Sequence, residues 1–307
     1  MHGDTRPWSP DTFRHPNGGD IMDYVVSMFV NRPYVVSLVL VFIVIAAAER
    51  GWLRMVIWLI TAGSVGWLSE FSSQRTGFPY GFYSYYPSSF ANELWISNVP
   101  LFASLSYAAL SYLGYSLTYT LFSPLRRGHL GVERVENRQL MLSLKVALWS
   151  SLLITWSDFV IDPITHLGEY WFLGKIYQYV PGDYGWLAFI YQHLGADWHF
   201  DVPLSNYVGW LITFFVIVYV NQLIDKALLK WNLEFKPAFS LPHRCLWSLA
   251  YYIGNFLFML SVNVYLYFNP AVPPEKQVGL ILVNTVVFIL AFVVFNVVVI
   301  RRKLQTG

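Results

Sequence analysis

Long apolar runs separated by short polar segments dominate this chain, and the pattern predicts a polytopic membrane protein. A helix that crosses the hydrocarbon core of a bilayer needs about 20 apolar residues. The first run is short, so its helix is expected to begin anywhere from Ile21 onward. The predicted spans are 34–48, 52–69, 99–122, 140–159, 204–224, 246–268 and 278–300. We therefore expect an all-α fold, a membrane helix bundle of about seven transmembrane helices.

The residues before the first span are polar and rich in proline and glycine. They contain no short apolar core followed by a small-residue cleavage site, so we expect no signal peptide. We expect residues 1–20 to form a disordered or surface-lying tail. Residues 21–303 are expected to form one integral membrane domain.

Basic residues predict how the bundle is oriented. Thirteen lysines and arginines lie in the loops after the first, third and fifth spans and in the C-terminal segment, against six on the other side. Cytoplasmic loops carry the excess of Lys and Arg. This bias places the N-terminus outside and the C-terminus in the cytoplasm.

The predicted orientation puts three loops on the outer side: 70–98, 158–203 and 269–277. The second is about forty residues long and contains apolar stretches too short to span, such as 184–191. Long structured loops are often functional. We expect this loop to be partly re-entrant or interfacial and to cap a cavity.

Composition supports a membrane protein and excludes some classes of function. The chain is 56% hydrophobic and 12% charged, whereas soluble proteins carry about 25% charged residues. A net charge of +2 lacks the basic face of a nucleic-acid-binding protein. The single cysteine, Cys245, allows no intrachain disulfide. Aromatic residues reach 19%, which suits interfacial belts and an apolar tunnel for a flat conjugated or isoprenoid ligand.

The strongest chemical signal is a pair of acids at the end of the fourth span. Asp158 and Asp162 lie four residues apart and share one helix face. Pro163 predicts that the helix ends near Asp162. In an apolar setting burial and like charge both disfavour ionising two carboxyl groups together, so the pair is expected to share one proton. The alternative is a helix end with solvated acids.

The segment 76–85 combines glycine, proline and tyrosine. Gly77 and Gly81 allow tight turns and close approach of the backbone to a ligand. Its tyrosines, Tyr80, Tyr83 and Tyr85, offer hydroxyl groups near the membrane boundary. The alternative is an aromatic turn that lies at the interface.

Polar residues also precede the fifth span. Asn206 is expected about one turn inside that helix, where it can hold a water or orient a carboxyl group. Asp201 suits a helix cap or an active-site acid equally well, and Ser205 also suits a cap. Glu70, at the end of the second span, is either a base near the site or an acid that reaches out to the interface.

Histidines give only a weak indication of a metal. His166, His193 and His199 fall on the outer side, and Asp162 and His166 are four residues apart. The HExxH motif is absent from the sequence, and interfacial hydrogen bonding is the competing interpretation. We expect no metal and no other cofactor.

Three stretches together resemble the membrane carotenoid hydratases of the CruF type, which include gamma-carotene 1'-hydroxylase and bisanhydrobacterioruberin hydratase. They are GFPYGFYSY at 77–85, WSDFVIDP at 156–163 and VPLSNYVGW at 202–210. The resemblance covers roughly residues 65–225. It implies a hydro-lyase that adds water to the terminal C1=C2 double bond of an acyclic ψ end group and forms a tertiary alcohol.

For this reaction we expect the following roles for individual residues. Asp158 or Asp162 would donate the proton, and Asp201 with Asn206 would hold the water. The residues expected to contact the substrate are Tyr80, Tyr83, Trp156, Trp210, Gly77 and Gly81. The expected partners are a carotenoid or isoprenoid lipid, the bilayer and other enzymes of carotenoid biosynthesis.

Three other functions compete with hydration. A membrane prenyltransferase would need two Asp-rich motifs for Mg²⁺-diphosphate, and the sequence offers one candidate, at Asp158 and Asp162. A zinc-dependent hydrolase of the ceramidase type would suit seven spans and the Asp162–His166 spacing, but its paired HxxxH is missing. A carotenoid-binding protein would hold the pigment without changing it.

Overall fold

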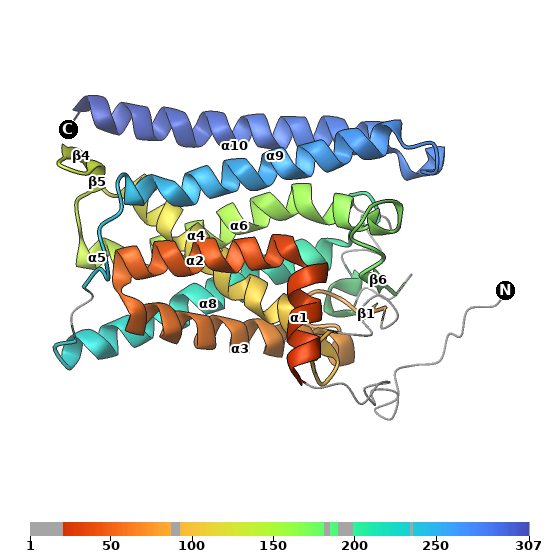
Figure 1. Ribbon diagram of the computed structural model, residues 1–307, viewed down its shortest axis with the longest axis horizontal. Coiled ribbons are helices and arrows are strands. Elements are labelled where there is room, and N and C mark those ends of the chain that lie inside the picture. Colours follow the sequence, from red (N-terminus) through yellow and green to blue (C-terminus); the bar gives the residue numbers. More distant parts are fainter. Residues whose placement is uncertain (1–20, 87–92, 181–184, 190–198, 234–235, 307) are drawn as a thin grey trace.

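The computed structural model describes residues 21–86, 93–180, 185–189, 199–233 and 236–306. Within them, seven long helices run roughly along one direction (Figure 1). They are α2 (Pro33–Arg50), α3 (Trp52–Thr76), α4 (Leu101–Phe122), α6 (Leu144–Thr165), α8 (Leu204–Lys230), α9 (Trp247–Phe268) and α10 (Val278–Thr306). The predicted all-α membrane bundle is confirmed. The predicted tail, 1–20, lies outside the described residues.

Six of these helices are long and apolar enough to cross a membrane, and α4 is not among them. The predicted span 99–122 does form a helix, but α4 runs through the middle of the bundle and every residue from 107 to 121 is buried. It packs against α2, α3 and α6. Because its side chains contact protein and not lipid, α4 accommodates many tyrosines, serines and threonines.

The first and fourth helices differ from their predicted bounds. A short helix, α1 (Ile21–Asn31), precedes α2, and Pro33 begins the new helix. Before α6 lies a one-turn helix, α5 (Arg138–Met141), and Ser143 caps α6 through its side chain. Leu140 and Met141, the first residues of the predicted span 140–159, therefore belong to a separate turn.

The prediction that Pro163 ends the helix near Asp162 was wrong, because α6 continues to Thr165. Proline cannot donate the backbone hydrogen bond to the residue four positions earlier. Here that acceptor, the Phe159 carbonyl, receives a hydrogen bond of 2.9 Å from Nδ2 of Asn284 in α10. A side chain from a distant helix thus replaces the missing bond where the helix continues past Pro163.

Short strands complete the two ends of the bundle. At one end β4 (Leu125–Gly128) and β5 (Gly131–Arg134) form a hairpin near the C-terminus (Figure 1). At the other end β1 (Tyr83–Tyr85) pairs antiparallel with β6 (Tyr177–Tyr179), and β2 (Trp95–Ile96) pairs with β3 (Val99–Pro100). Three-residue turns of 3₁₀ helix lie at Gly168–Tyr170, Gly185–Leu187, Arg244–Leu246 and Pro274–Lys276.

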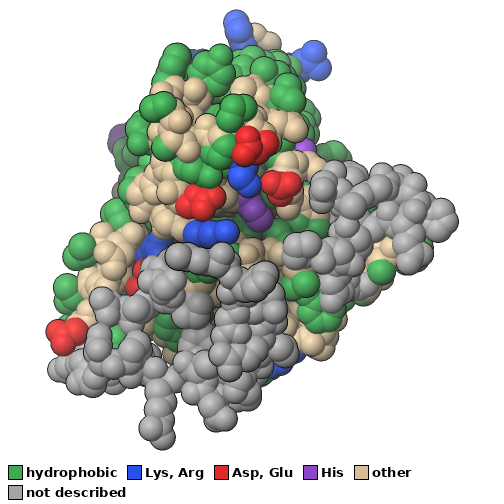
Figure 2. Space-filling view, turned by 90° about the vertical axis from the view of Figure 1, so that its right-hand side faces the viewer, with side chains coloured by type: hydrophobic (Ala, Val, Ile, Leu, Met, Phe, Trp, Pro, Cys, Tyr) green, Lys and Arg blue, Asp and Glu red, His purple; other side chains and the backbone are tan. Residues whose placement is uncertain are grey.

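The β1–β6 pairing joins the two loops that the orientation rule placed on one side. Tyr83 lies opposite Tyr179, and Tyr85 lies opposite Tyr177. Of the apolar stretch 184–191, only 185–189 lies within the described residues. Figure 2 looks onto this end of the molecule, where acidic, basic and histidine side chains gather near the centre of the face. Which end faces the cytoplasm stays a prediction.

Candidate active site

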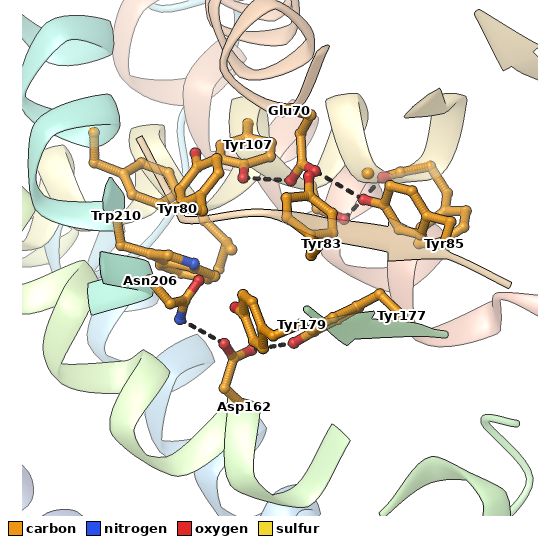
Figure 3. A pocket seen from close by; sticks show the side chains of 15 residues that line it. Glu70, Tyr80, Tyr83, Tyr85, Tyr107, Asp162, Tyr177, Tyr179, Asn206 and Trp210 are labelled. Carbon is orange, nitrogen blue, oxygen red and sulfur yellow. Dashed lines mark hydrogen bonds between the residues drawn. The ribbon is translucent and has the colours of Figure 1, made fainter. Parts of the chain in front are cut away.

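A pocket of about 150 Å³ lies at the end of the bundle that carries β1 and β6 (Figure 3). Side chains from four long helices, the two strands and the tyrosine-rich turn converge on it. Its polar lining consists of Glu70, Asp162, Asn206, Tyr80, Tyr83, Tyr85, Tyr107, Tyr177 and Tyr179. The rest is Phe102, Ala103, Ser106, Leu110, Trp210 and Phe214. A few converging polar groups in an apolar pocket are typical of a ligand site.

One amide group holds the two predicted aspartates together. Nδ2 of Asn206 donates to Oδ2 of Asp158 at 2.8 Å and to Oδ2 of Asp162 at 2.6 Å. Tyr177 donates to the other oxygen of Asp162 at 2.8 Å. Asp158 is fully buried, and its Oδ1 receives no hydrogen bond from a donor in the described part of the chain.

The tyrosine-rich turn is attached to the start of α8. Gly77 ends α3 in the left-handed conformation, with φ 73°, and Gly81 has φ 92°. A side chain at Gly81 would lie 2.6 Å from Oγ of Ser205, so only glycine fits there. Ser205 donates to the Tyr80 carbonyl at 2.9 Å. The turn and Asn206 are therefore fixed relative to each other.

Glu70 forms a second acidic centre in the same pocket. Tyr107 donates to its Oε1 at 2.6 Å and Tyr85 donates to its Oε2 at 3.0 Å. Its side chain is buried, so the interpretation that it reaches out to the interface does not hold. Figure 3 shows Glu70 with Tyr107 and Tyr85 on one side of the pocket, and Asp162 with Asn206 and Tyr177 on the other.

The tyrosines of the two strands are neutral hydrogen-bonding groups. Burial raises the pKa of Tyr85, Tyr177 and Tyr179 well above the ordinary value of 10. Tyr83 is buried, lines the pocket, and its hydroxyl group has no hydrogen-bond partner among the residues that the structure describes. The hydroxyl of Tyr80, in contrast, is bonded to Ser69 and Thr213, each at 2.9 Å.

A larger and mostly apolar cavity of about 600 Å³ adjoins the pocket. It lies among α2, α4 and α9, and α9 contributes Gly254 and Phe258. Both cavities share the lining residues Tyr85, Phe102, Ser106, Leu110, Tyr177 and Trp210. The site therefore combines a small polar compartment with a long apolar one, which suits a ligand with one reactive end and an apolar chain.

A comparison with known families identifies the kind of protein to which this site belongs. The model of a family described as carotenoid biosynthesis protein matches residues 31–285. The chain belongs to this carotenoid biosynthesis protein family. The match runs from α2 into α10 and includes every residue of the pocket. No curated protein and no solved structure matches the chain. The carotenoid biosynthesis protein described here is an integral membrane protein by the length and composition of its helices.

Five of the residues expected at the site do not line the pocket. Asp158 lies next to it on Asn206, and Gly77 and Gly81 shape the tyrosine-rich turn. The other two, Asp201 and Trp156, lie away from it. Asp201 is exposed and lies 3.8 Å from Lys276, and α8 begins after Pro203, so Asp201 does not cap that helix either. Trp156 donates from its indole nitrogen to the Phe288 carbonyl at 3.2 Å and packs against the Phe288 ring. It therefore faces α10.

The histidines do not assemble a metal site in the described residues. No group of three or more His, Cys, Asp or Glu side chains suited to a metal occurs there. His166 stacks on Tyr179, and burial lowers its pKa to about 4. His199 lies 3.3 Å from the Phe159 carbonyl. His193 lies outside the described residues.

Three tyrosines of the pocket were not found from the sequence: Tyr107, Tyr177 and Tyr179. Tyr177 and Tyr179 alternate along β6, which is the spacing of two side chains on one face of a strand. That signal was present but short. Tyr107 stands in a predicted span with many tyrosines, and nothing in its spacing distinguished it from the others.

Proposed function

We propose that this protein adds water across the terminal C1=C2 double bond of an acyclic carotenoid end group. The product is a tertiary alcohol. The observation that supports this most directly is the pair of carboxyl groups held by one amide, next to a pocket that adjoins an apolar cavity. The reaction needs a positioned acid, a water and a sheltered apolar chain, and no redox step.

The acid in this proposal is the Asp158–Asp162 pair. Both carboxyl groups accept from the same amide nitrogen, so they lie close together. Like charges this close in a buried setting disfavour two ionised groups. We therefore assign one shared proton to the pair. A positioned general acid of this kind typically accelerates a reaction by about 10²–10⁴-fold.

The chemical step transfers that proton to C2 of the end group. The π electrons form the new C–H bond, and the positive charge develops at C1, which is tertiary. Water then forms the C1–O bond and loses a proton, so the sum of the reaction is the addition of one water. The faces of Tyr83 and Trp210 line the pocket. Contact with an aromatic face stabilises such a cation by roughly 0.5–2 kcal/mol.

Asn206 orients the acid in this scheme. An amide nitrogen has two hydrogens, and Asn206 directs them to the two carboxyl groups. The polar pocket, at about 150 Å³, has room for an end group and a water, while the apolar cavity of about 600 Å³ takes the chain. An extended C40 chain is about as long as the hydrocarbon core is thick, roughly 30 Å.

The test is expression in a host that accumulates an acyclic carotene, with the products analysed by mass. The wild-type protein should produce carotenoids heavier by one water per modified end. Asp158→Asn and Asp162→Asn should each abolish this product while the protein still accumulates in membranes. Asp201→Asn is the matched control and should leave the yield unchanged, because that side chain is exposed and outside the pocket. Unchanged hydration in both pocket variants would refute the proposed acid.

The same products distinguish the competing functions. Chain elongation by a prenyltransferase would add carbon units to the carotene, and its yield would depend on Mg²⁺. A binding protein would retain pigment through purification without any change of mass. A hydrolase would release a fragment instead of adding water to an intact chain.

A further inference from the structure

Glu70 is an acid that the proposed hydration does not yet use, although it lines the pocket. We propose that Glu70 binds the attacking water and accepts its proton, so that acid and base act from opposite walls of one pocket. This inference rests on the proposed hydration and assigns the residue that completes it.

The other buried acids show that Glu70 is unusual in this chain. Away from the pocket, each buried acid in the described residues is paired with an arginine. The pairs are Glu49 with Arg134, Glu93 with Arg32 and Asp225 with Arg54. No lysine or arginine in the described residues pairs with Glu70, Asp158 or Asp162. Burying an acid without a cation is costly, so acids left in this state mark the chemical site.

The hydrogen bonds around Glu70 suit a base. Its two oxygens accept from two hydroxyl groups, those of Tyr107 in α4 and Tyr85 in β1. Phenolic donors favour the ionised form of a carboxyl group. The Asp158–Asp162 pair is different, because its two carboxyl groups share one amide donor and, in the described part of the chain, only one phenol, that of Tyr177, donates to them. The two centres therefore differ in the way that an acid and a base must differ.

The paired strands β1 and β6 fix the distance between the two centres. Tyr85 of β1 bonds to Glu70, and Tyr177 of β6 bonds to Asp162. These two tyrosines are partners in the strand register, and their ring centroids lie 6.3 Å apart. The two-stranded sheet thus positions one tyrosine to bond to Glu70 and another to bond to Asp162.

The proton balance of this scheme is complete. The aspartate pair loses its proton to C2, and the cation at C1 accepts a lone pair from the water. The resulting oxonium transfers one proton to Glu70, and the neutral alcohol remains. Before the next turnover a proton must move from Glu70 to the aspartate pair. Tyr85 and Tyr177 lie side by side between the two centres.

The test separates protonation of the substrate from its capture by water. In D₂O an aspartate pair that protonates C2 reversibly introduces deuterium into unreacted carotene, even when no alcohol forms. In Glu70→Gln we expect hydration to fall by about 10²-fold or more, while the recovered carotene still gains deuterium. In Asp158→Asn both hydration and deuterium uptake should be lost. Glu169→Gln, an exposed acid on the same end, should match the wild type.

Full hydration by Glu70→Gln would overturn the inference, and so would the loss of both hydration and deuterium uptake. If Glu70→Gln fails to accumulate, Tyr107→Phe tests the same point, because it removes the shorter of the two hydrogen bonds to Glu70 and keeps the ring. It should reduce hydration and retain deuterium uptake. Failure of the wild type to hydrate any carotene would instead refute the proposed function itself.

Discussion

The contact between α8 and the tyrosine-rich turn gives the most direct quantitative prediction. At Gly209 the helix has no side chain, and the turn approaches its backbone closely. A Cβ atom added there would lie 2.5 Å from Cδ1 of Tyr80 and 2.8 Å from the Pro79 carbonyl oxygen. Ordinary contact begins near 3.4 Å. In Gly209→Ala the turn must therefore move by roughly 0.6–0.9 Å, a form of overpacking.

The cost follows from comparison with a second helical glycine. Overpacking typically costs about 1–3 kcal/mol, whereas alanine in place of glycine in a helix gains about 1 kcal/mol. At Gly63 an added Cβ would lie 3.6 Å from the Ser104 carbonyl, which is an ordinary contact. Gly63→Ala should therefore gain only the stability that alanine brings to a helix in place of glycine. The two variants should differ in free energy of unfolding by about 1–3 kcal/mol. The gain from replacing glycine by alanine in a helix is common to both variants and cancels in this comparison.

Activity should separate the two variants as well. The displaced turn carries Tyr80 and Tyr83, while α8 carries Asn206, so the two sides of the pocket shift relative to each other. A misplacement of about 1 Å can cost about 10²-fold in rate. Thermal unfolding in detergent measures the stability difference, and product mass in a carotene-accumulating host measures activity. Equal stability and equal activity of Gly209→Ala and Gly63→Ala would refute the reasoning.

Two further predictions concern the apolar cavity and His166. Gly254 lines that cavity, and nothing lies within 4 Å of a Cβ atom added there. Gly254→Phe should therefore fill the space and abolish turnover, whereas Gly254→Ala should stay active. Full turnover by Gly254→Phe would show that the chain binds elsewhere. Burial lowers the pKa of His166 from 6.5 to about 4. Between these pH values the unfolded chain binds a proton at this residue and the folded chain does not. The free energy of unfolding therefore falls as the pH drops through this range. His166→Phe should show a flatter decline in thermal unfolding from pH 7 to pH 5, and identical slopes would contradict this.

Part of the pocket was predictable because a helix has a fixed period. The spacing of four residues placed Asp158 and Asp162 on one face, and in the structure both accept a hydrogen bond from Asn206. The same period explains why Trp156 lies elsewhere. Residues two positions apart on a helix do not face the same way, so a tryptophan two residues before Asp158 cannot share its pocket, and it packs on Phe288.

Other features depended on segments far away in the sequence. Helix α6 continues past Pro163 because Asn284, more than one hundred residues later, donates to the Phe159 carbonyl. Glu70 was open to two interpretations until Tyr107 and Tyr85 were seen on its oxygens. Asp201 suited a helix cap and an active-site acid equally well, but the fold places it at the surface beside Lys276.

The sequence by itself determined the class of fold, the approximate positions of the long helices and the faces of individual helices, because hydrophobic length and helical period are local properties. It also determined the acid pair, since both carboxyl groups lie on one helical turn. Only the tertiary structure decided which side chains meet across the pocket. Asn206 donates to the aspartates, and the tyrosines of β1 and β6 donate to Glu70 and to Asp162. Such contacts join elements that are distant in the chain, and packing alone sets their distance and direction.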